Sequence, residues 1–238
     1  MSGKTIFDGM MTRAETAVSN GQQPVAVFDL DGTLFDNGPR TLSILAEFAN
    51  ETDNEALAAA LRTRDGKPTP YLLADLFHEM GETNEELIKA ASDFWFKRFF
   101  TNDYQAYDKV MPGAVSFVND FYRSGGTVVY LTGRDAPNMV IGCVAALQKG
   151  GFPIGVTRTS LVLKPDFDTA DLAFKREAVN FIEHLGEVVV SLDNEPGNCN
   201  LFLESWPNAL IGFIDTQCAP GAPKLLEGIE TFKDFLRQ

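Results

Sequence analysis

Short, uninterrupted apolar runs alternate with segments of helical periodicity along most of this chain, and this alternation restricts the fold more than any other feature. We interpret five runs as strands, at residues 24–28, 127–131, 160–163, 187–192 and 209–214. The intervening periodicity predicts helices at residues 115–122, 137–148, 170–184, 197–204 and 224–237. Strands that are apolar on both faces are typical of parallel sheets covered by helices on each side. The sequence therefore predicts an α/β fold with a parallel sheet and helices on both faces.

One long segment, residues 37–108, interrupts the alternation. Its apolar residues recur at helical spacing near 42–49, 57–61, 72–77 and 87–99. The last of these helices is expected to begin at Thr83, because Glu86 three residues later forms a capping box with it. We expect about four helices and no strand there, which predicts a helical insert. The α/β core would then consist of residues 1–36 and 109–238.

Charge and cysteine content exclude several classes of protein. The 238 residues include 33 acidic and 20 basic ones, a net charge of −13, whereas binders of nucleic acid or of anionic membranes need a basic field. The three cysteines, Cys143, Cys199 and Cys218, match no disulfide framework or zinc motif. No apolar stretch suits a membrane span or a signal peptide, which predicts a cytoplasmic protein. Residues 1–22 have a weak helical pattern and are expected to pack on the core or the insert.

Polar side chains follow three of the predicted strands at the point where each strand ends. They are Asp29 and Asp31, Thr132, and Asp193. The carboxyl ends of parallel strands meet at one edge of a sheet, where ligands bind in folds of this kind. Clustered carboxylates repel one another, and Mg²⁺ with a phosphate substrate is their simplest partner. One aspartate can attack phosphorus, and a second one two residues on can protonate the leaving group and then deprotonate water.

The segment at 29–33 (DLDGT) resembles the first motif of the haloacid dehalogenase-like hydrolase superfamily, a DxDGT pentapeptide at the end of the first strand. The run at 132–134 (TGR), which follows an apolar strand, resembles the second motif, and the Pro-Gly pair at 112–113 also recurs in that family. The resemblance covers residues 22–36 and 108–238. It implies a Rossmann-like sheet and a C1-type cap formed by the helical insert.

The resemblance also implies a role for each matching residue. Asp29 would be the nucleophile and a metal ligand. Asp31 would be the general acid and base, with its backbone carbonyl on the metal. Thr132 and Gly133 would bind the phosphoryl oxygens, and Asp193 would be a direct or water-bridged ligand of Mg²⁺.

The third motif of the family is a lysine that neutralises the nucleophile and the phosphate, and two lysines fit it. Lys175 is favoured because it begins a helix that leads into the Asp193 strand, and because the run at 173–176 resembles the motif. Lys164 is the alternative, since a Lys-Pro pair also occurs in capped members of the family.

The fourth motif departs from the family pattern. The family usually has a second acid one, four or five residues after the Asp193 position, where this chain has Asn194, Gly197 and Asn198. Glu195 lies two residues on. We therefore expect Asn194, Glu195 or Asn198 to orient a metal-bound water, in a site that is one negative charge poorer than usual.

The presence of Asp31 points to phosphatase or phosphomutase chemistry, because the dehalogenases proper lack that aspartate. The favoured function is a Mg²⁺-dependent phosphomonoester hydrolase that acts through an aspartyl-phosphate on a small phosphorylated metabolite. Two alternatives stay open: a non-catalytic ligand-binding or regulatory protein on the same fold, and a phosphomutase or phosphotransferase. The protein is expected to be a monomer or a homodimer.

Three further groups of residues have two interpretations each. Arg134 is expected to bind substrate or to pair with Asp135 or Asp31. The basic loop at 62–67 is expected to be solvated, or else to meet an anionic substrate. The aromatic residues at 94–100 exceed one helix face, so some are expected to line the pocket or a dimer interface.

Overall fold

The computed structural model describes residues 3–237, so Met1, Ser2 and Gln238, at the two ends of the predicted core, lie outside the described residues. Its main sheet has six strands in the order β5-β4-β1-β6-β7-β8, and every neighbouring pair is parallel. The strands are β1 (Pro24–Phe28), β4 (Thr127–Asp135), β5 (Thr159–Lys164), β6 (Glu187–Asp193), β7 (Leu210–Ile214) and β8 (Glu230–Phe232). The parallel α/β sheet predicted from the sequence is confirmed.

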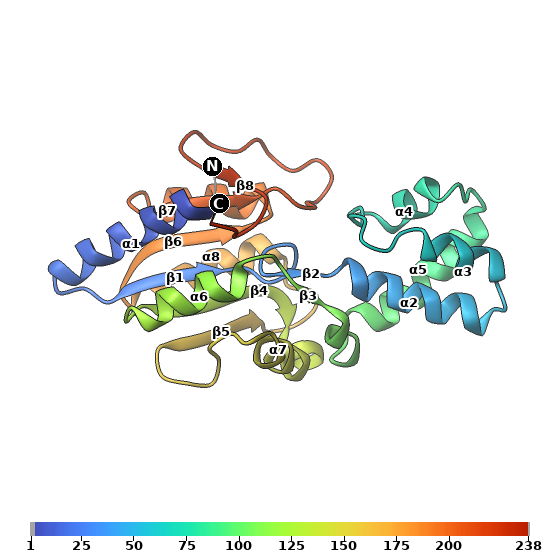
Figure 1. Ribbon diagram of the computed structural model, residues 1–238, viewed down its shortest axis with the longest axis horizontal. Coiled ribbons are helices and arrows are strands. Elements are labelled where there is room, and N and C mark those ends of the chain that lie inside the picture. The colour runs from blue at the N-terminus through green and yellow to red at the C-terminus, as the bar shows by residue number, and fades with distance from the viewer. Residues whose placement is uncertain (1–2, 238) are drawn as a thin grey trace.

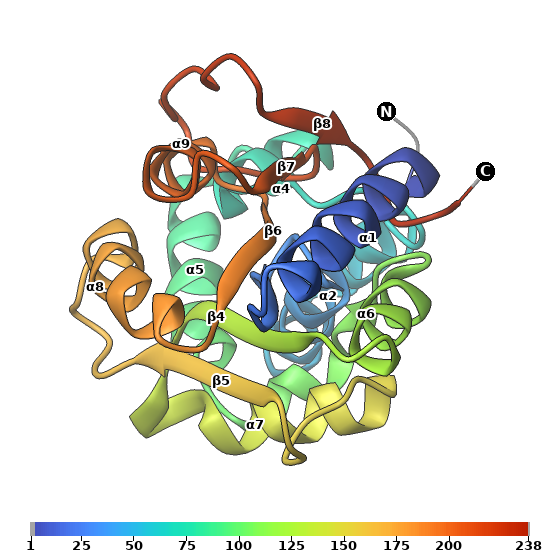
Figure 2. The same cartoon turned by 90° about the vertical axis from the view of Figure 1, so that its left-hand side faces the viewer.

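Helices cover both faces of this sheet. On one face lie α1 (Gly3–Ser19), α6 (Ala114–Arg123) and α7 (Ala136–Gly150), and on the other lie α8 (Asp171–Glu183) and α9 (Pro196–Ser205). Figure 2 shows α1 and α6 on one side of the strands and α8 and α9 on the other. The N-terminal helix expected within residues 1–22 packs on the core, where Ile6, Met10 and Ala17 of α1 are fully buried.

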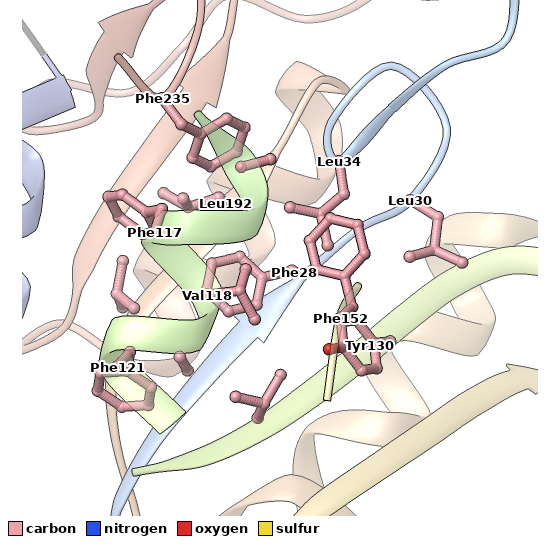
Figure 3. Packing of buried hydrophobic residues seen from close by; sticks show 14 of the residues in the cluster. Phe28, Leu30, Leu34, Phe117, Val118, Phe121, Tyr130, Phe152, Leu192 and Phe235 are labelled. Carbon is pink, nitrogen blue, oxygen red and sulfur yellow. The ribbon is translucent and has the colours of Figure 1, made fainter. Parts of the chain in front are cut away.

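The larger of the two core clusters is rich in aromatic rings. Phe28 of β1 packs edge-on against Phe117 of α6, and Phe117 packs against Phe235 near the C-terminus, with ring centroids 6.2 and 5.2 Å apart (Figure 3). Tyr130 of β4 lies in the same cluster and donates its hydroxyl to the carbonyl of Pro153. Each ring contributes roughly 1.5–3 kcal/mol by burial, so this face holds β1 and its terminal residues firmly.

The helical insert, residues 37–108, lies beside the carboxyl ends of the strands (Figure 1). Its helices are α2 (Gly38–Glu51), α3 (Glu55–Arg62), α4 (Leu73–Glu79) and α5 (Glu85–Phe99), followed by a 3₁₀ turn, η1 (Asp103–Tyr107). They enclose a separate apolar cluster that includes Leu45, Phe48 and Phe77. The chain enters and leaves the insert through a two-stranded antiparallel ribbon, β2 (Phe35–Asp36) and β3 (Lys109–Val110).

Two local predictions were wrong. The chain at 224–237 is not helical: Gly228 has a φ of +98°, which ends any helix, and β8 instead extends the edge of the sheet beside β7. Helix α5 is capped by Asn84 rather than Thr83, because the Asn84 side chain accepts hydrogen bonds from the amides of Glu86 and Leu87. Between residues 3 and 237, none of the helices is both long and apolar enough to cross a membrane.

Candidate active site

Two aspartates and one lysine meet at the carboxyl edge of the sheet. Asp29 directly follows β1, and Asp193 ends the adjacent β6. The ammonium group of Lys175, in the second turn of α8, lies 2.9 Å from Oδ1 of Asp29 and 2.8 Å from Oδ2 of Asp193. All three side chains are almost fully buried. The structure thus brings together three residues that the sequence placed on separate elements.

Burial dominates the electrostatics of this cluster. It raises the pKa of Asp29 well above its ordinary value, against the opposing attraction of Lys175, and the nearby charge of Asp193 adds to the rise. Burial likewise raises the pKa of Asp193. The pKa of Lys175 is raised too, because the attraction of its carboxylate neighbours outweighs its own desolvation. One cation among several buried carboxylates leaves the site with excess negative charge.

A third carboxylate, Asp171, belongs to the same cluster and was missed in the sequence. Its Oδ2 lies 3.6 Å from Nζ of Lys175, one helical turn away on α8. Its Oδ1 is buried without a hydrogen-bond partner in the structure. A side chain at Gly133 would place Cβ 2.4 Å from that oxygen, so any larger residue at 133 would displace the Asp171 carboxylate. The spacing of four residues between Asp171 and Lys175 was the one signal in the sequence that could have indicated it.

Asp31, which lines the same pocket, pairs with two arginines. Arg134 donates from Nε and Nη2 to its two carboxylate oxygens, each at 2.7 Å, and Arg40 donates to Oδ1 at 3.1 Å. Asn37 donates to the same Oδ1 at 3.2 Å. Burial alone would raise the pKa of Asp31, but the two guanidinium charges outweigh it and hold that pKa well below its ordinary range. Of the two pairings considered for Arg134, the structure shows the one with Asp31.

Asp108 completes a buried ionic network around these arginines. It accepts from Nε of Arg40 at 2.7 Å and from Nη2 of Arg134 at 2.8 Å. Gln105 accepts a further hydrogen bond from Arg134. Arg40 and Asp108 have no exposed side-chain surface. Because Arg40 lies just after β2 and Asp108 just before β3, the network joins both connections of the insert to the Asp31 loop.

We expect Arg40→Met to destabilise the protein by about 3 kcal/mol, since it leaves buried carboxylate charge with fewer partners. Arg98→Met is the matched control, because Arg98 also pairs with two acids on the insert, Glu47 and Glu51, but at the surface. That control should cost no more than about 1 kcal/mol. Urea unfolding measures the difference in stability between the two variants, from their midpoints when the slopes of their unfolding transitions are equal. Equal losses in both variants would contradict the structural importance of the buried network.

The second-motif residues lie where β4 loses its regular pairing. Thr132 still pairs with Leu163 of β5, and the register then shifts before Asp135. The hydroxyl of Thr132 is buried and accepts a hydrogen bond from the amide of Arg134. Gly133 lines the pocket described below. Asp135 caps α7 by accepting from the amide of Asn138, so it is not the partner of Arg134.

The three residues expected around the fourth motif have different surroundings. The amide of Asn198 donates to both oxygens of Asp193 and to Asp171, each at 3.2 Å, so Asn198 orients two carboxylates of the cluster. Asn194 donates to the backbone carbonyl of Gln217. The Glu195 carboxylate accepts from the amide of Ala219, and burial raises its pKa to about 7. Asn194 and Glu195 therefore hold the loop after β7, and both line the pocket.

The competing lysine lies outside the cluster. Nζ of Lys164 donates to the backbone carbonyls of Phe167 and Thr169 and so holds the loop between β5 and α8. In the basic loop of the insert, Arg64 pairs with Glu79. Lys175 is thus the lysine that lies against Asp29, and residues 62–67 do not line the pocket beside it.

The residues present fit a divalent cation, although not through three converging side chains. Within residues 3–237, no group of three acidic, histidine or cysteine side chains is arranged around a common point as metal ligands. Three carboxylates, those of Asp29, Asp171 and Asp193, lie around the single cation Lys175. One oxygen of Asp171 also has no hydrogen-bond partner. Both features favour binding of a cation or a hydrogen-bond donor. Mg²⁺ needs only one or two carboxylates beside water and phosphate oxygens. Asp29 and Asp193 meet that requirement.

A pocket of about 260 Å³ opens above the cluster, between the sheet and the insert. Its base includes Asp29, Gly133, Asp171 and Lys175. Its opposite side is formed by residues of the insert: Asn37, Thr41, Pro70, Tyr71, Leu73, Trp95, Phe99 and Phe100. The predicted involvement of the aromatic residues at 94–100 in a pocket is therefore confirmed for three of them.

Comparison with solved structures agrees with this architecture. A candidate phosphatase from Clostridium difficile matches with a TM-score of 0.54 at 14% identity, over 88% of this chain and 94% of that one. The Protein Tyrosine Kinase A of Mycobacterium tuberculosis matches with a TM-score of 0.53 at 13% identity, over 88% and 93% of the two chains. A haloacid dehalogenase-like family hydrolase from Streptococcus pneumoniae matches with a TM-score of 0.49 at 13% identity, over 81% and 84%.

No protein-family model matches the sequence, and no curated protein matches it significantly. At these low identities the structural likeness shows the fold alone. The parallel sheet carries the DLDGT segment after β1, the TGR segment in β4 and Asp193 at the end of β6, at one common edge. The chain therefore shares the parallel α/β fold of the Clostridium difficile structure, and the three segments that resemble family motifs lie together at one edge of its sheet.

Proposed function

We propose that this protein is a Mg²⁺-dependent phosphomonoester hydrolase that forms an aspartyl-phosphate on Asp29. The observation that carries the proposal is the position of the Asp29 carboxylate. It lies at the base of a pocket, 2.9 Å from a buried lysine that Asp193 also contacts. A carboxylate held against a fixed cation at a sheet edge suits in-line attack on a phosphoryl group.

The reaction would take place in two displacements. In the first, a carboxylate oxygen of Asp29 forms a bond to phosphorus while the bond from phosphorus to the leaving-group oxygen breaks, and that oxygen takes up a proton, from Asp31 in the acid role that the resemblance implies. In the second, water attacks the same phosphorus, the aspartyl bond breaks, and inorganic phosphate is released. Lys175 would offset the negative charge of the phosphoryl oxygens in both steps, and Gly133 leaves room for them beside its backbone.

In this proposal Asp31 accepts a proton in the second displacement. Both of its oxygens already accept hydrogen bonds from guanidinium groups, and it is ionised in this arrangement. An ionised carboxylate suits the second displacement, in which the attacking water loses a proton. The acid role that the resemblance implies for the first displacement stays a prediction.

Asp29 and Asp193 would hold the metal ion, with the backbone carbonyl of Asp31 as the third protein ligand that the resemblance implies. When bound, Mg²⁺ would supply positive charge to the phosphoryl oxygens and lower the raised pKa of Asp29, so that this carboxylate is ionised for attack. Asn198 would keep Asp193 oriented toward the metal. The insert would exclude bulk water from the pocket as a C1-type cap does.

Phosphate release from 4-nitrophenyl phosphate tests the proposal. We expect turnover with Mg²⁺, its loss after treatment with EDTA, and its return when excess Mg²⁺ is added. Turnover that is unaffected by EDTA would contradict the metal requirement. Turnover that needs an added alcohol acceptor would favour a phosphotransferase. Binding of inorganic phosphate without any turnover would favour the non-catalytic alternative, in which the site recognises a ligand only.

A further inference from the structure

The insert side of the pocket has a chemical character that the phosphoryl chemistry does not require. Trp95 and Phe99 of α5 and the following Phe100 form a continuous group of rings, here called the aromatic wall. Ring centroids lie 4.4 Å apart for Trp95 and Phe99, and 5.0 Å apart for Phe99 and Phe100. A simple lid that excludes water could be lined by any apolar side chains, so three adjoining rings need another explanation.

Contacts on the insert fix the orientation of these rings. The indole nitrogen of Trp95 donates to the hydroxyl of Thr41 on α2, at 3.2 Å. The guanidinium of Arg40 lies over the ring of Phe99, 4.4 Å from its centroid. Rings that are held in place before a ligand arrives lose little conformational freedom when they bind it.

A contact from the core holds the far end of the wall. Phe167, in the loop between β5 and α8, packs edge-on against Phe100 with ring centroids 5.1 Å apart. The same loop leads into Asp171 at the start of α8. The aromatic wall is therefore positioned relative to the phosphoryl end of the pocket from both the insert and the core.

The charge around the pocket selects against anionic leaving groups. Of the described residues that line it, Lys175 is the only cation, and Asp29 and Asp193 already contact that lysine. Asp31 and Asp171 also line the pocket, and Glu195, whose pKa is raised to about 7, carries only part of a negative charge at neutral pH. A leaving group with its own carboxylate or second phosphate would have no counter-charge there and would face repulsion.

The size of the pocket suits a small leaving group. Its volume of about 260 Å³ includes the space for the phosphoryl group. Ligand pockets for drug-sized molecules are typically larger, at about 300 Å³ or more. One ring with short substituents fits this space beside the phosphoryl group.

From these observations we infer that the substrate is a small monophosphate whose leaving group contains a flat aromatic ring and has no negative charge. This inference rests on the proposed function, because it assigns the phosphoryl group to the Asp29 end of the pocket. The ring would pack against Trp95 and Phe99, and its polar substituents would meet Thr41, Asn37 or Gln217, which also line the pocket.

Binding of phosphonates tests the inference without requiring turnover. We would titrate the protein with Mg²⁺ present, using benzylphosphonate, cyclohexylmethylphosphonate and 4-(phosphonomethyl)benzoate in a calorimeter. The first two are similar in size but only one is flat and aromatic. We expect benzylphosphonate to bind about fivefold more tightly than the cyclohexyl compound, as one good ring contact would give. The carboxylated compound should bind more weakly than benzylphosphonate.

Two variants separate ring contact from general damage to the insert. Trp95→Leu should bring the benzyl-to-cyclohexyl preference close to one. Phe94→Leu is the control. Phe94 neighbours Trp95 on α5 but packs on Phe48 inside the insert and does not line the pocket. The Phe94→Leu variant should therefore keep the wild-type preference for the benzyl over the cyclohexyl compound. Loss of the preference in Phe94→Leu as well would overturn the assignment to the aromatic wall.

The remaining outcomes distinguish failure of the inference from failure of the proposed function. Equal binding of benzyl and cyclohexyl compounds would overturn the aromatic inference while leaving the phosphoryl site intact. Tighter binding of the carboxylated compound would overturn the charge argument. Absence of binding by all three phosphonates and by inorganic phosphate would overturn both the inference and the proposed function.

Discussion

Asp29→Asn is expected to lower turnover by at least about 10⁴-fold, a loss typical of removing a covalent nucleophile. The protein should stay folded and be no less stable. Burial raises the pKa of Asp29, which means that folding disfavours its charged form, and a neutral amide of the same shape avoids that cost. Phosphate release gives the first quantity, and thermal unfolding gives the second.

A matched carboxylate-to-amide change controls for non-specific effects. Asp168 lies exposed in the loop before α8 and does not line the pocket, so Asp168→Asn should keep wild-type turnover. Rapid acid quenching of the wild-type reaction, followed by mass spectrometry, should find one phosphoryl group on the peptide that contains Asp29. Undiminished turnover by Asp29→Asn would rule out the aspartyl-phosphate mechanism.

Lys175→Met should have the largest effect on stability. Only 2% of the Lys175 side chain is exposed, and its removal leaves the buried carboxylates of Asp29 and Asp193 without their cation. Breaking a buried ion pair from one side typically costs about 3–5 kcal/mol. We expect a loss of that size at neutral pH in urea unfolding, together with loss of turnover.

The pH dependence of that loss identifies its cause. Without Lys175 the pKa values of Asp29 and Asp193 in the folded state rise further above their unfolded values. An acid with a raised folded pKa favours folding at low pH and loses that contribution as pH rises through the folded pKa. The stability gap between Lys175→Met and wild type should therefore narrow as pH falls from neutral toward 4. A gap that is independent of pH would point to lost packing instead.

A double variant gives a second check. Asp29→Asn combined with Lys175→Met removes one negative and one positive charge together. It should recover part of the stability that Lys175→Met alone loses, because fewer buried charges lack a partner. Additive losses in the double variant would show that the two side chains do not interact in solution.

The parts of the fold that could be predicted are those in which local pattern and burial agree. The runs that form β1, β4, β6 and β7 are apolar on both faces, and such runs have few alternatives to a buried strand. The segment at 224–237 shows the limit of this reasoning. Leu225, Ile229 and Phe232 recur at helical spacing, yet Gly228 adopts a left-handed conformation and a free sheet edge was available beside β7.

Some residues of the candidate site could likewise be predicted from the sequence, and others could not. Asp29, Lys175 and Asp193 could be found because each is tied to the end or beginning of a predicted element. Arg40 and Asp108 could not, since a charged residue on a helix or beside a turn is usually solvated and neither position shows that it is buried. Their burial depends on how the insert packs against the loop after β1, a long-range contact that local spacing does not encode.

The central place of β1 in the sheet also has a consequence for how the chain folds. This strand is synthesised before its neighbours in the sheet, which lie far along the chain: Val25 pairs with Thr127 on one side and with Val188 on the other. Both hydrogen-bonding edges of this apolar strand therefore stay unpaired until partners more than 100 residues away in β4 and more than 160 residues away in β6 have been made. Such high contact order slows folding and exposes the strand to aggregation. The segment that carries the candidate nucleophile is thus made before either of its partner strands and is fully paired only after β6 has left the ribosome.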